Sequence, residues 1–115
     1  VPVPAASLTH AYYRQYAYLD VDLLTPGWTR DRVLHEVGLR QPIPVLTGSC
    51  SEIYREVAFD GAAWLPDRAL PQAAAMSECG VAFLVHPGLT HEDMARQAGA
   101  LADVLATALD GGEES

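Results

Sequence analysis

GVAFLVHPGLTHEDM, at residues 80–94, is the stretch that decides the fold. Its five apolar residues, Val81–Val85, are ended by a Pro-Gly pair and are typical of a strand buried on both faces. Thr90 then suits a helix N-cap, and Asp93 three residues later favours a short form of the capping box. The stretch therefore predicts one strand that leads into one helix through a tight turn.

Working outward, the same kinds of signal predict the remaining elements. Aromatic alternation indicates a strand, a Thr after a Pro-Gly turn indicates an N-cap, and a Pro suits the first position of a helix. In chain order these elements are a strand in His10–Leu19, a helix from Thr29 to Gly38, a strand at Ile43–Leu46, a helical turn at Ser51–Arg55, a loop at Val57–Arg68 anchored by Phe59 and Trp64, a helix from Pro71 closed by Gly80, and a helix at His91–Leu109.

The last predicted helix has an apolar stripe that advances by four and three residues. The stripe consists of Met94, Ala98, Leu101, Leu105 and Ala108. The order β-α-β-α-β-α predicts an α/β fold, a two-layer small domain with a three-stranded sheet and helices packed against it. The exposed face of such a sheet needs a partner.

The composition limits the class of protein. The 115 residues allow one domain, and half of them are hydrophobic, which is enough for a modest core. A net charge of −8 argues against a nucleic-acid partner. The sequence contains no run of eighteen apolar residues and so predicts no membrane span, and no signal peptide is visible. The first residue is not Met, so we expect a processed product or a piece of a longer chain.

The cysteines and lysines narrow the chemistry further. Cys50 and Cys79 have no CxxC spacing, which disfavours a zinc ribbon and favours two reduced thiols in a cytoplasmic protein. All seven basic side chains are arginines, so the chain contains no lysine. Schiff-base chemistry on a side-chain amine and a P-loop are therefore excluded within this chain.

The polar loop Thr47–Ser51 is a candidate site with three interpretations. It follows a predicted strand, where backbone N–H groups can bind an anion. It also has the composition of an ordinary turn. A nucleophilic Ser49 or Cys50 is the third interpretation and needs a nearby base, for which His86 is the candidate. The flanking pattern of a GxSxG elbow is absent.

Other polar and aromatic residues carry weaker signals. His86 ends a strand, where open α/β sheets place ligands, but a histidine bonded to backbone at a turn explains it equally well. The four histidines lack metal-ligand spacing. The tyrosines of the first strand can stack on a base or a sugar, or fill a core. The carboxylates show no pairing that supports acid–base chemistry. The carboxylates considered are Asp20, Asp22, Asp31, Glu52 and Glu56.

Several phrases of the sequence, taken together, resemble a known family. They are HAYYRQYAYLD, PGWTRDRV, IPVLTGSCSEIYREVAFD, LPDRALPQAAAM and VAFLVHPGLTHEDMARQAGALADVL. They are similar to the C-terminal small domain of the DegT/DnrJ/EryC1/StrS aminotransferases, and the resemblance covers residues 1–109. The family consists of pyridoxal-phosphate enzymes of fold type I that aminate keto sugars, usually nucleotide-linked ones.

The resemblance implies a division of the chain and a set of partners. Residues 1–9 would be a connector from a missing large N-terminal domain, residues 10–109 the small domain and residues 110–115 a flexible acidic tail. In the family the lysine and the other residues that hold the cofactor lie in that large domain, so the fragment alone would bind no pyridoxal phosphate and be inactive. The active sites of the family lie between two subunits, which implies a homodimer.

The resemblance also implies the substrate contacts. The small domain would close the cleft and contact the sugar nucleotide, with Ser49 and Cys50, then Tyr13, Arg14 and His86, facing the substrate. Arg14 would bind a diphosphate in bidentate fashion. Many members carry a His-Tyr or His-Phe pair where this chain has Thr47-Gly48-Ser49-Cys50. This departure indicates a subgroup whose sugar or carrier differs from that of those members. A free-standing regulatory or interaction domain that shares this ancestry is the alternative.

Overall fold

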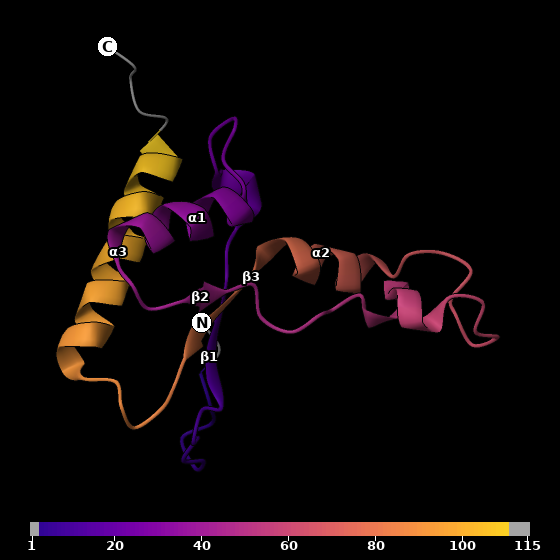
Figure 1. Cartoon of the computed structure of the whole chain (residues 1–115), viewed down its shortest axis with the longest axis horizontal. Helices are drawn as coiled ribbons and strands as arrows, with labels where there is room; N and C mark the ends of the chain where they lie inside the picture. The colour runs from indigo at the N-terminus through magenta and orange to yellow at the C-terminus, as the bar shows by residue number, and fades with distance from the viewer. Residues whose placement is uncertain (1–2, 111–115) are drawn as a thin grey trace.

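The computed structural model describes residues 3–110, and they form a sheet with two helices on it and a projecting arm (Figure 1). The N-terminal end of the expected connector (residues 1–2) and most of the expected tail (residues 111–115) lie outside the described residues. The strands are β1 (Arg14–Tyr18), β2 (Val45–Leu46) and β3 (Gly80–Leu84), and the helices are α1 (Arg30–Arg40), α2 (Pro71–Cys79) and α3 (His91–Asp110). Short 3-10 turns lie at η1 (Val21–Leu23), η2 (Ile53–Arg55) and η3 (Val57–Phe59).

Strand β3, the first part of the stretch 80–94, forms the centre of the sheet. The strand order is β1-β3-β2, and β3 pairs antiparallel with both neighbours. Tyr16 lies opposite Ala82, and Leu46 pairs with Ala82 from the other side. The predicted α/β fold with a three-stranded sheet and packed helices is confirmed for the described residues.

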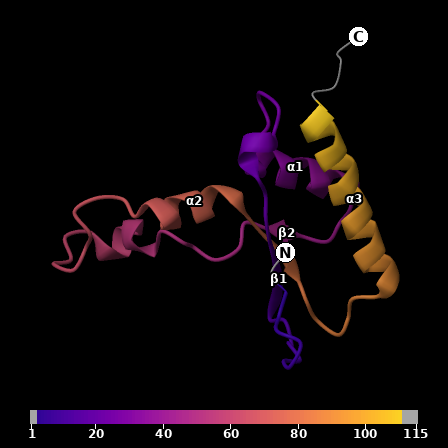
Figure 2. The same ribbon diagram turned by 180° about the vertical axis from the view of Figure 1, so that it is seen from behind.

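The two faces of the sheet have different environments. Residues alternate across a strand, so Val45, Phe83 and Val81 share one face, and Val45 packs against the cluster formed by α1 and α3. Tyr16 and Arg14 share the opposite face, called here the outer face. Helices α1 and α3 cover only the inner face, as Figure 2 shows from behind.

The core lies between α1 and α3. It contains Val33 and Val37 from α1 and Ala100, Val104 and Ala108 from α3, all buried. Val33 and Val37 lie four residues apart and therefore on one face of α1. On α3 the predicted stripe was partly wrong.

The stripe predicted on α3 is rotated in the structure. Met94 is 47% exposed and Ala98 is also exposed, whereas Gln97 and Ala100 are buried. Leu101 and Leu105 are only partly buried beside the core. Two of the three core residues that α3 contributes are alanines, so the line of large apolar residues was a misleading guide.

The helix starts agree with the sequence and one helix end does not. The Thr29 hydroxyl accepts the backbone N–H of Arg32, and Thr90 and Asp93 form the predicted capping box. Helix α1 continues past Gly38 to Arg40, so Gly38 is not its end. The helix ends instead where the buried Gln41 amide makes two hydrogen bonds with the backbone of Ile43, at 2.6 and 2.8 Å.

Residues 48–79 form an arm that projects away from the rest of the described chain, called here the body (Figures 1 and 2). The arm carries η2, η3 and α2, and the rings of Phe59 and Trp64, the two predicted anchors of its loop, lie edge to face at 5.1 Å. The radius of gyration is 16.8 Å, against about 13 Å for a compact chain of this length. The arm therefore makes the molecule open rather than globular.

The two ends of the arm meet at the sheet. A Cβ atom placed on Gly80 would lie 3.0 Å from the carbonyl oxygen of Thr47 and 3.2 Å from that of Met76. Only glycine tolerates that approach without movement of the backbone. The arm is thus a long excursion within the β2–β3 hairpin, and it leaves and re-enters the sheet at one point.

Candidate functional site

The loop Thr47–Ser51 folds back over the outer face of the sheet. Gly48 has a φ of +90°, which favours glycine, and a Cβ there would lie 3.2 Å from the Tyr16 ring. The Tyr16 hydroxyl lies 3.0 Å from the Ser49 hydroxyl in a hydrogen bond. This contact joins β1 to the loop and places Ser49 on the outer face.

Arg14 is the first residue of β1 and Tyr13 directly precedes it, so both lie on the N-terminal side of Tyr16. The Arg14 guanidinium lies 5.5 Å from the centre of the Tyr13 ring, and Tyr13 is 82% exposed. Within residues 3–110 the Arg14 side chain makes no ion pair. Because Arg14 and Tyr16 share the outer face two residues apart, their Cα atoms are about 7 Å apart along the strand.

His86 lies past the end of β3, which pairs with the start of β1. Its Nδ1 accepts the backbone N–H of Gly88 at 3.2 Å, so the ring is bonded to its own turn. No hydrogen bond within residues 3–110 joins it to Ser49, Cys50, Tyr13 or Arg14. Open α/β sheets place ligands at the ends of parallel strands, whereas β3 is antiparallel to both of its neighbours. The prediction of a ligand site at His86 from its place at a strand end therefore loses its basis.

Cys50 faces the Glu56 carboxylate and not the imidazole of His86. Its thiol donates a hydrogen bond to Glu56 Oε1 at 3.3 Å. This bond, with burial and the charge of Glu56, raises the pKa of the Cys50 thiol above its ordinary value. A protonated thiol is a poor nucleophile, so the geometry counts against the thiol-hydrolase interpretation of Cys50 and His86.

A polar hollow of about 430 Å³ lies between the loop and the base of the arm. Hydroxyl groups line it, together with Arg30, Arg55, Glu52 and Glu56. The Arg30 guanidinium already donates to Asp31 and to the carbonyl oxygens of Ser77 and Gly80. With two carboxylates present and Arg30 occupied, the hollow suits hydroxyl-bearing ligands better than anions.

The structure thus divides the five predicted site residues. Ser49 and Cys50 line the hollow, Tyr13 and Arg14 lie beyond Tyr16, and His86 is turned to its own backbone. The predicted role of each in substrate binding stays a prediction. The helix after the loop, η2, has three residues, so the helix-dipole argument for an anion site does not apply.

Sequence reasoning did not single out the residues that organise this region. Tyr16 was one of several tyrosines, and its alternation with Arg14 on one face was the available signal. Glu52 appeared only as an unpaired carboxylate, whereas in the structure it accepts hydrogen bonds from Tyr54 and Ser77. The Ser77 contact spans 25 residues, and no local pattern announces it.

Two general properties concern the described part of the chain. Among residues 3–110, no three side chains of His, Cys, Asp or Glu gather closely enough to hold a metal ion. None of the helices described combines the length and apolar character that crossing a membrane requires.

Comparison with known proteins gives one informative result. No family model matches the chain, and no curated protein matches it. Among solved structures, the chain is similar to an aminotransferase from Psychrobacter cryohalolentis, with 39% sequence identity and a TM-score of 0.81. The match covers 87% of this chain but 25% of that one, so the chain spans about a quarter of the length of the enzyme it resembles.

Because the match covers 87% of the chain, it includes residues of both the body and the arm. The confirmed arrangement of the sheet with its helices is therefore that of a segment of a larger enzyme. The chain has the fold of part of an aminotransferase.

Proposed function

We propose that this chain is the C-terminal small domain of a pyridoxal-phosphate-dependent aminotransferase of the DegT/DnrJ/EryC1/StrS family, which acts on a keto sugar linked to a nucleotide. The observation that carries the proposal is the match to an aminotransferase, at 39% identity over 87% of the chain. The family resemblance of the segments SCSEIYREVAF (residues 49–59) and FLVHPGLTHEDM (residues 83–94) supports the narrower assignment. The parent would be a cytoplasmic homodimer that takes its amino group from glutamate or glutamine.

The residues of this chain do not fit a role in holding the cofactor. The chain contains no lysine, so none of its side chains can form an imine with pyridoxal phosphate. In the proposal the missing large domain binds the cofactor, and the present residues contact the substrate and close the cleft. The isolated chain would be inactive.

The outer face of the sheet is the proposed substrate wall. Ser49 and Tyr16 form a hydroxyl pair at 3.0 Å that suits a sugar hydroxyl, and the hollow beside them is polar. Arg14 lies further along the strand with its guanidinium over the exposed Tyr13, which suits a diphosphate. The sugar would face the loop and the diphosphate would face Arg14.

The absorption spectrum of the protein from the complete reading frame tests the proposal. A yellow protein that bleaches when glutamate is added supports a transaminase. A colourless protein that takes up no pyridoxal phosphate contradicts it and leaves the free-standing regulatory or interaction domain.

The substrate contact is tested separately with Arg14→Ala in the complete enzyme. Loss of one charge-assisted contact is expected to raise the KM for a sugar nucleotide about tenfold or more. Arg40→Ala is the matched control, because Arg40 pairs with Glu36 on α1, on the covered side of the sheet. An unchanged KM in Arg14→Ala would remove Arg14 from the substrate wall.

A further inference from the structure

The orientation of the arm is not set by apolar packing. In the part of the chain that the structure describes, the most extensive contacts between elements are those of β1 with β3, β2 with β3, α1 with α3 and α1 with β2. Helix α2 belongs to none of them. Several large apolar side chains of the arm are exposed, with Val57 81% and Trp64 61% exposed. Polar contacts must therefore hold the arm in place.

One carboxylate joins the outgoing and returning limbs of the arm. The Tyr54 hydroxyl donates to Glu52 Oε1 at 2.8 Å, and the Ser77 hydroxyl lies 3.2 Å from Oε2. Ser77 also lies 2.7 Å from the carbonyl oxygen of Ala74, so its proton is shared. The Glu52 side chain is only 13% exposed, although the chain around it is open.

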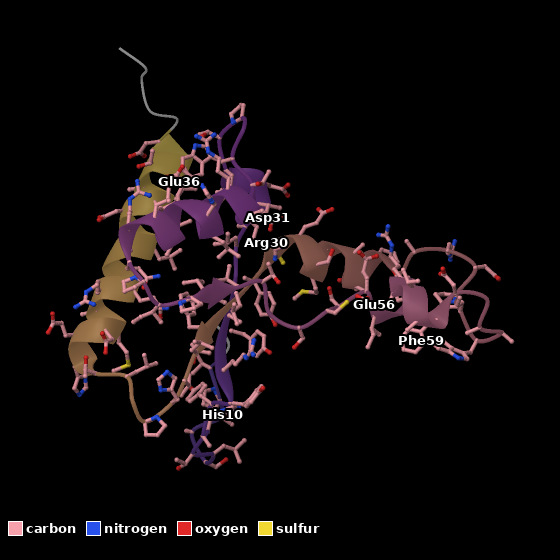
Figure 3. The ribbon with its side chains drawn as sticks, viewed as in Figure 1. His10, Arg30, Asp31, Glu36, Glu56 and Phe59 are labelled. Carbon is pink, nitrogen blue, oxygen red and sulfur yellow. The ribbon has the colours of Figure 1, made fainter. Side chains whose placement is uncertain are left out.

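The same network extends to both ends of the returning limb. The backbone N–H of Leu70, just before α2, donates to the Tyr54 hydroxyl at 3.0 Å. At the other end of α2, Arg30 donates to the carbonyl oxygens of Ser77 and Gly80 at 2.8 and 2.7 Å. Figure 3 shows Arg30 at the start of α1, beside the base of the arm. A continuous set of hydrogen bonds thus connects α1 to the start of α2.

Glu52 occupies the centre of this set. Tyr54 and Ser77 both direct a hydroxyl at it, and Arg55 approaches both of its oxygens at 3.3 and 3.4 Å. Replacing it leaves these donors without their shared acceptor inside a largely covered site. Glu56 is close in sequence but contacts Cys50 instead, so it provides a matched control.

We propose that Glu52 is a positioning residue that fixes the orientation of the arm by holding Tyr54 and Ser77 together. The group Glu52, Tyr54, Leu70 and Ser77 is called here the clasp. Because Glu52 directly follows the loop Thr47–Ser51, the clasp also fixes where Ser49 and Cys50 lie on the outer face. The clasp rests on geometry alone, while its effect on a substrate rests on the proposed function.

Amide hydrogen exchange in the complete protein tests the clasp without reference to any activity. The Leu70 amide is the reporter, because its acceptor is the Tyr54 hydroxyl. Glu52→Gln and Tyr54→Phe are expected to speed its exchange about tenfold. Amides of α1 and α3 should exchange as in the unmodified protein, which shows that the body is folded. Glu56→Gln should leave Leu70 unchanged.

Two results would overturn the clasp. One is wild-type exchange at Leu70 in both variants, and the other is equal loss of protection in α1 and α3, which would make Glu52 a general stability residue. Tyr54→Phe keeps the ring and removes one hydroxyl, so it separates the hydrogen bonds from packing.

A kinetic measurement tests the effect on the loop. In an active aminotransferase, Glu52→Gln should raise the KM for the sugar nucleotide several-fold more than it lowers kcat, because the misplaced loop contacts substrate and not cofactor. An equal fall in kcat with KM unchanged would contradict positioning. If the parent has no transaminase activity, the proposed function fails while the exchange result still decides the clasp.

Discussion

At the scale of single residues, the hydrogen bond from Cys50 to Glu56 controls the chemistry of the exposed thiol. Glu56→Gln removes the carboxylate that raises the pKa of Cys50. The thiolate fraction at neutral pH then grows, and Cys50 should react faster with a thiol reagent. Mass spectrometry of the labelled protein measures both cysteines at once. Cys79, which is half-buried and has no contact with Glu56, should keep its rate; if Cys50 also does, the carboxylate is not the cause.

The capping box of α3 makes a second prediction at this scale. The backbone N–H and hydroxyl of Thr90 donate to the Asp93 carboxylate and lower its pKa below 3.8. The unfolded chain therefore takes up the proton first as the pH falls, so stability from this group is complete above that value and is lost below it. Urea unfolding between about pH 2 and pH 6 should show a weaker acid dependence for Asp93→Asn.

The control for that experiment is Asp103→Asn, an exposed residue of the same helix whose side chain has no role in the cap. The acid dependence should be that of the unmodified protein. If both variants behave alike, the cap does not account for the loss of stability in acid.

Residue-level features were predictable from the sequence when their partners are close in the chain. The Thr29 and Thr90 caps have partners three residues away and were identified correctly. The Cys50 contact with Glu56 and the role of Glu52 were not predicted, because helix and strand periodicity gives no information about side-chain contacts in an irregular loop. Substrate roles of Ser49 and Arg14 remain predictions.

At the scale of elements, the contact between α1 and α3 supplies the core. Val104→Ala removes two methyl groups from a fully buried position. The free energy of unfolding should fall by about 2 kcal/mol, from lost burial and the cavity left behind. Denaturant unfolding followed by circular dichroism measures this change.

Leu109→Ala in the same helix is the matched control, since Leu109 is 46% exposed and its truncation should cost less than about 1 kcal/mol. Equal losses in the two variants would mean that α3 packs differently. The comparison also tests the correction to the apolar stripe, because the sequence pattern favoured Met94 and Ala98 over Val104.

The elements themselves were predicted well, and their packing less so. Every predicted helix and strand exists, since each has a local signal such as a cap, a Pro at the first position or an apolar run. The face that α3 buries carries Ala100 and Ala108 beside Val104, so small residues make up much of it. A pattern that ranks positions by size alone misses it.

At the scale of the whole molecule, the arm is separable from the body. Replacing residues 49–78 by an Asn-Gly connection should keep the β2–β3 hairpin, because Thr47 and Gly80 already touch. The radius of gyration, measured by X-ray scattering on the same chain with and without the arm, should fall from 16.8 Å towards the value of about 12 Å that a compact chain of the shorter length has.

Circular dichroism of the shortened chain checks that α1 and α3 remain. Loss of their helical signal or of cooperative unfolding would show that the arm is part of the core. The sequence predicted the open shape only in part, as a sheet face that needs a partner, because no segment of this sequence carries a signal for covering that face.

The meeting of the arm's two ends has a consequence for the order in which the chain folds. Pairing Leu46 with Ala82 requires closing a long loop, and each doubling of loop length costs about 0.6 kcal/mol in entropy. The contact of Tyr54 with Leu70 spans 16 residues and that of Glu52 with Ser77 spans 25, so each is nested inside the next. When these contacts form in order from the tip of the arm towards the sheet, each contact shortens the loop that the next one has to close. We therefore expect the arm to bring β2 and β3 into register during folding.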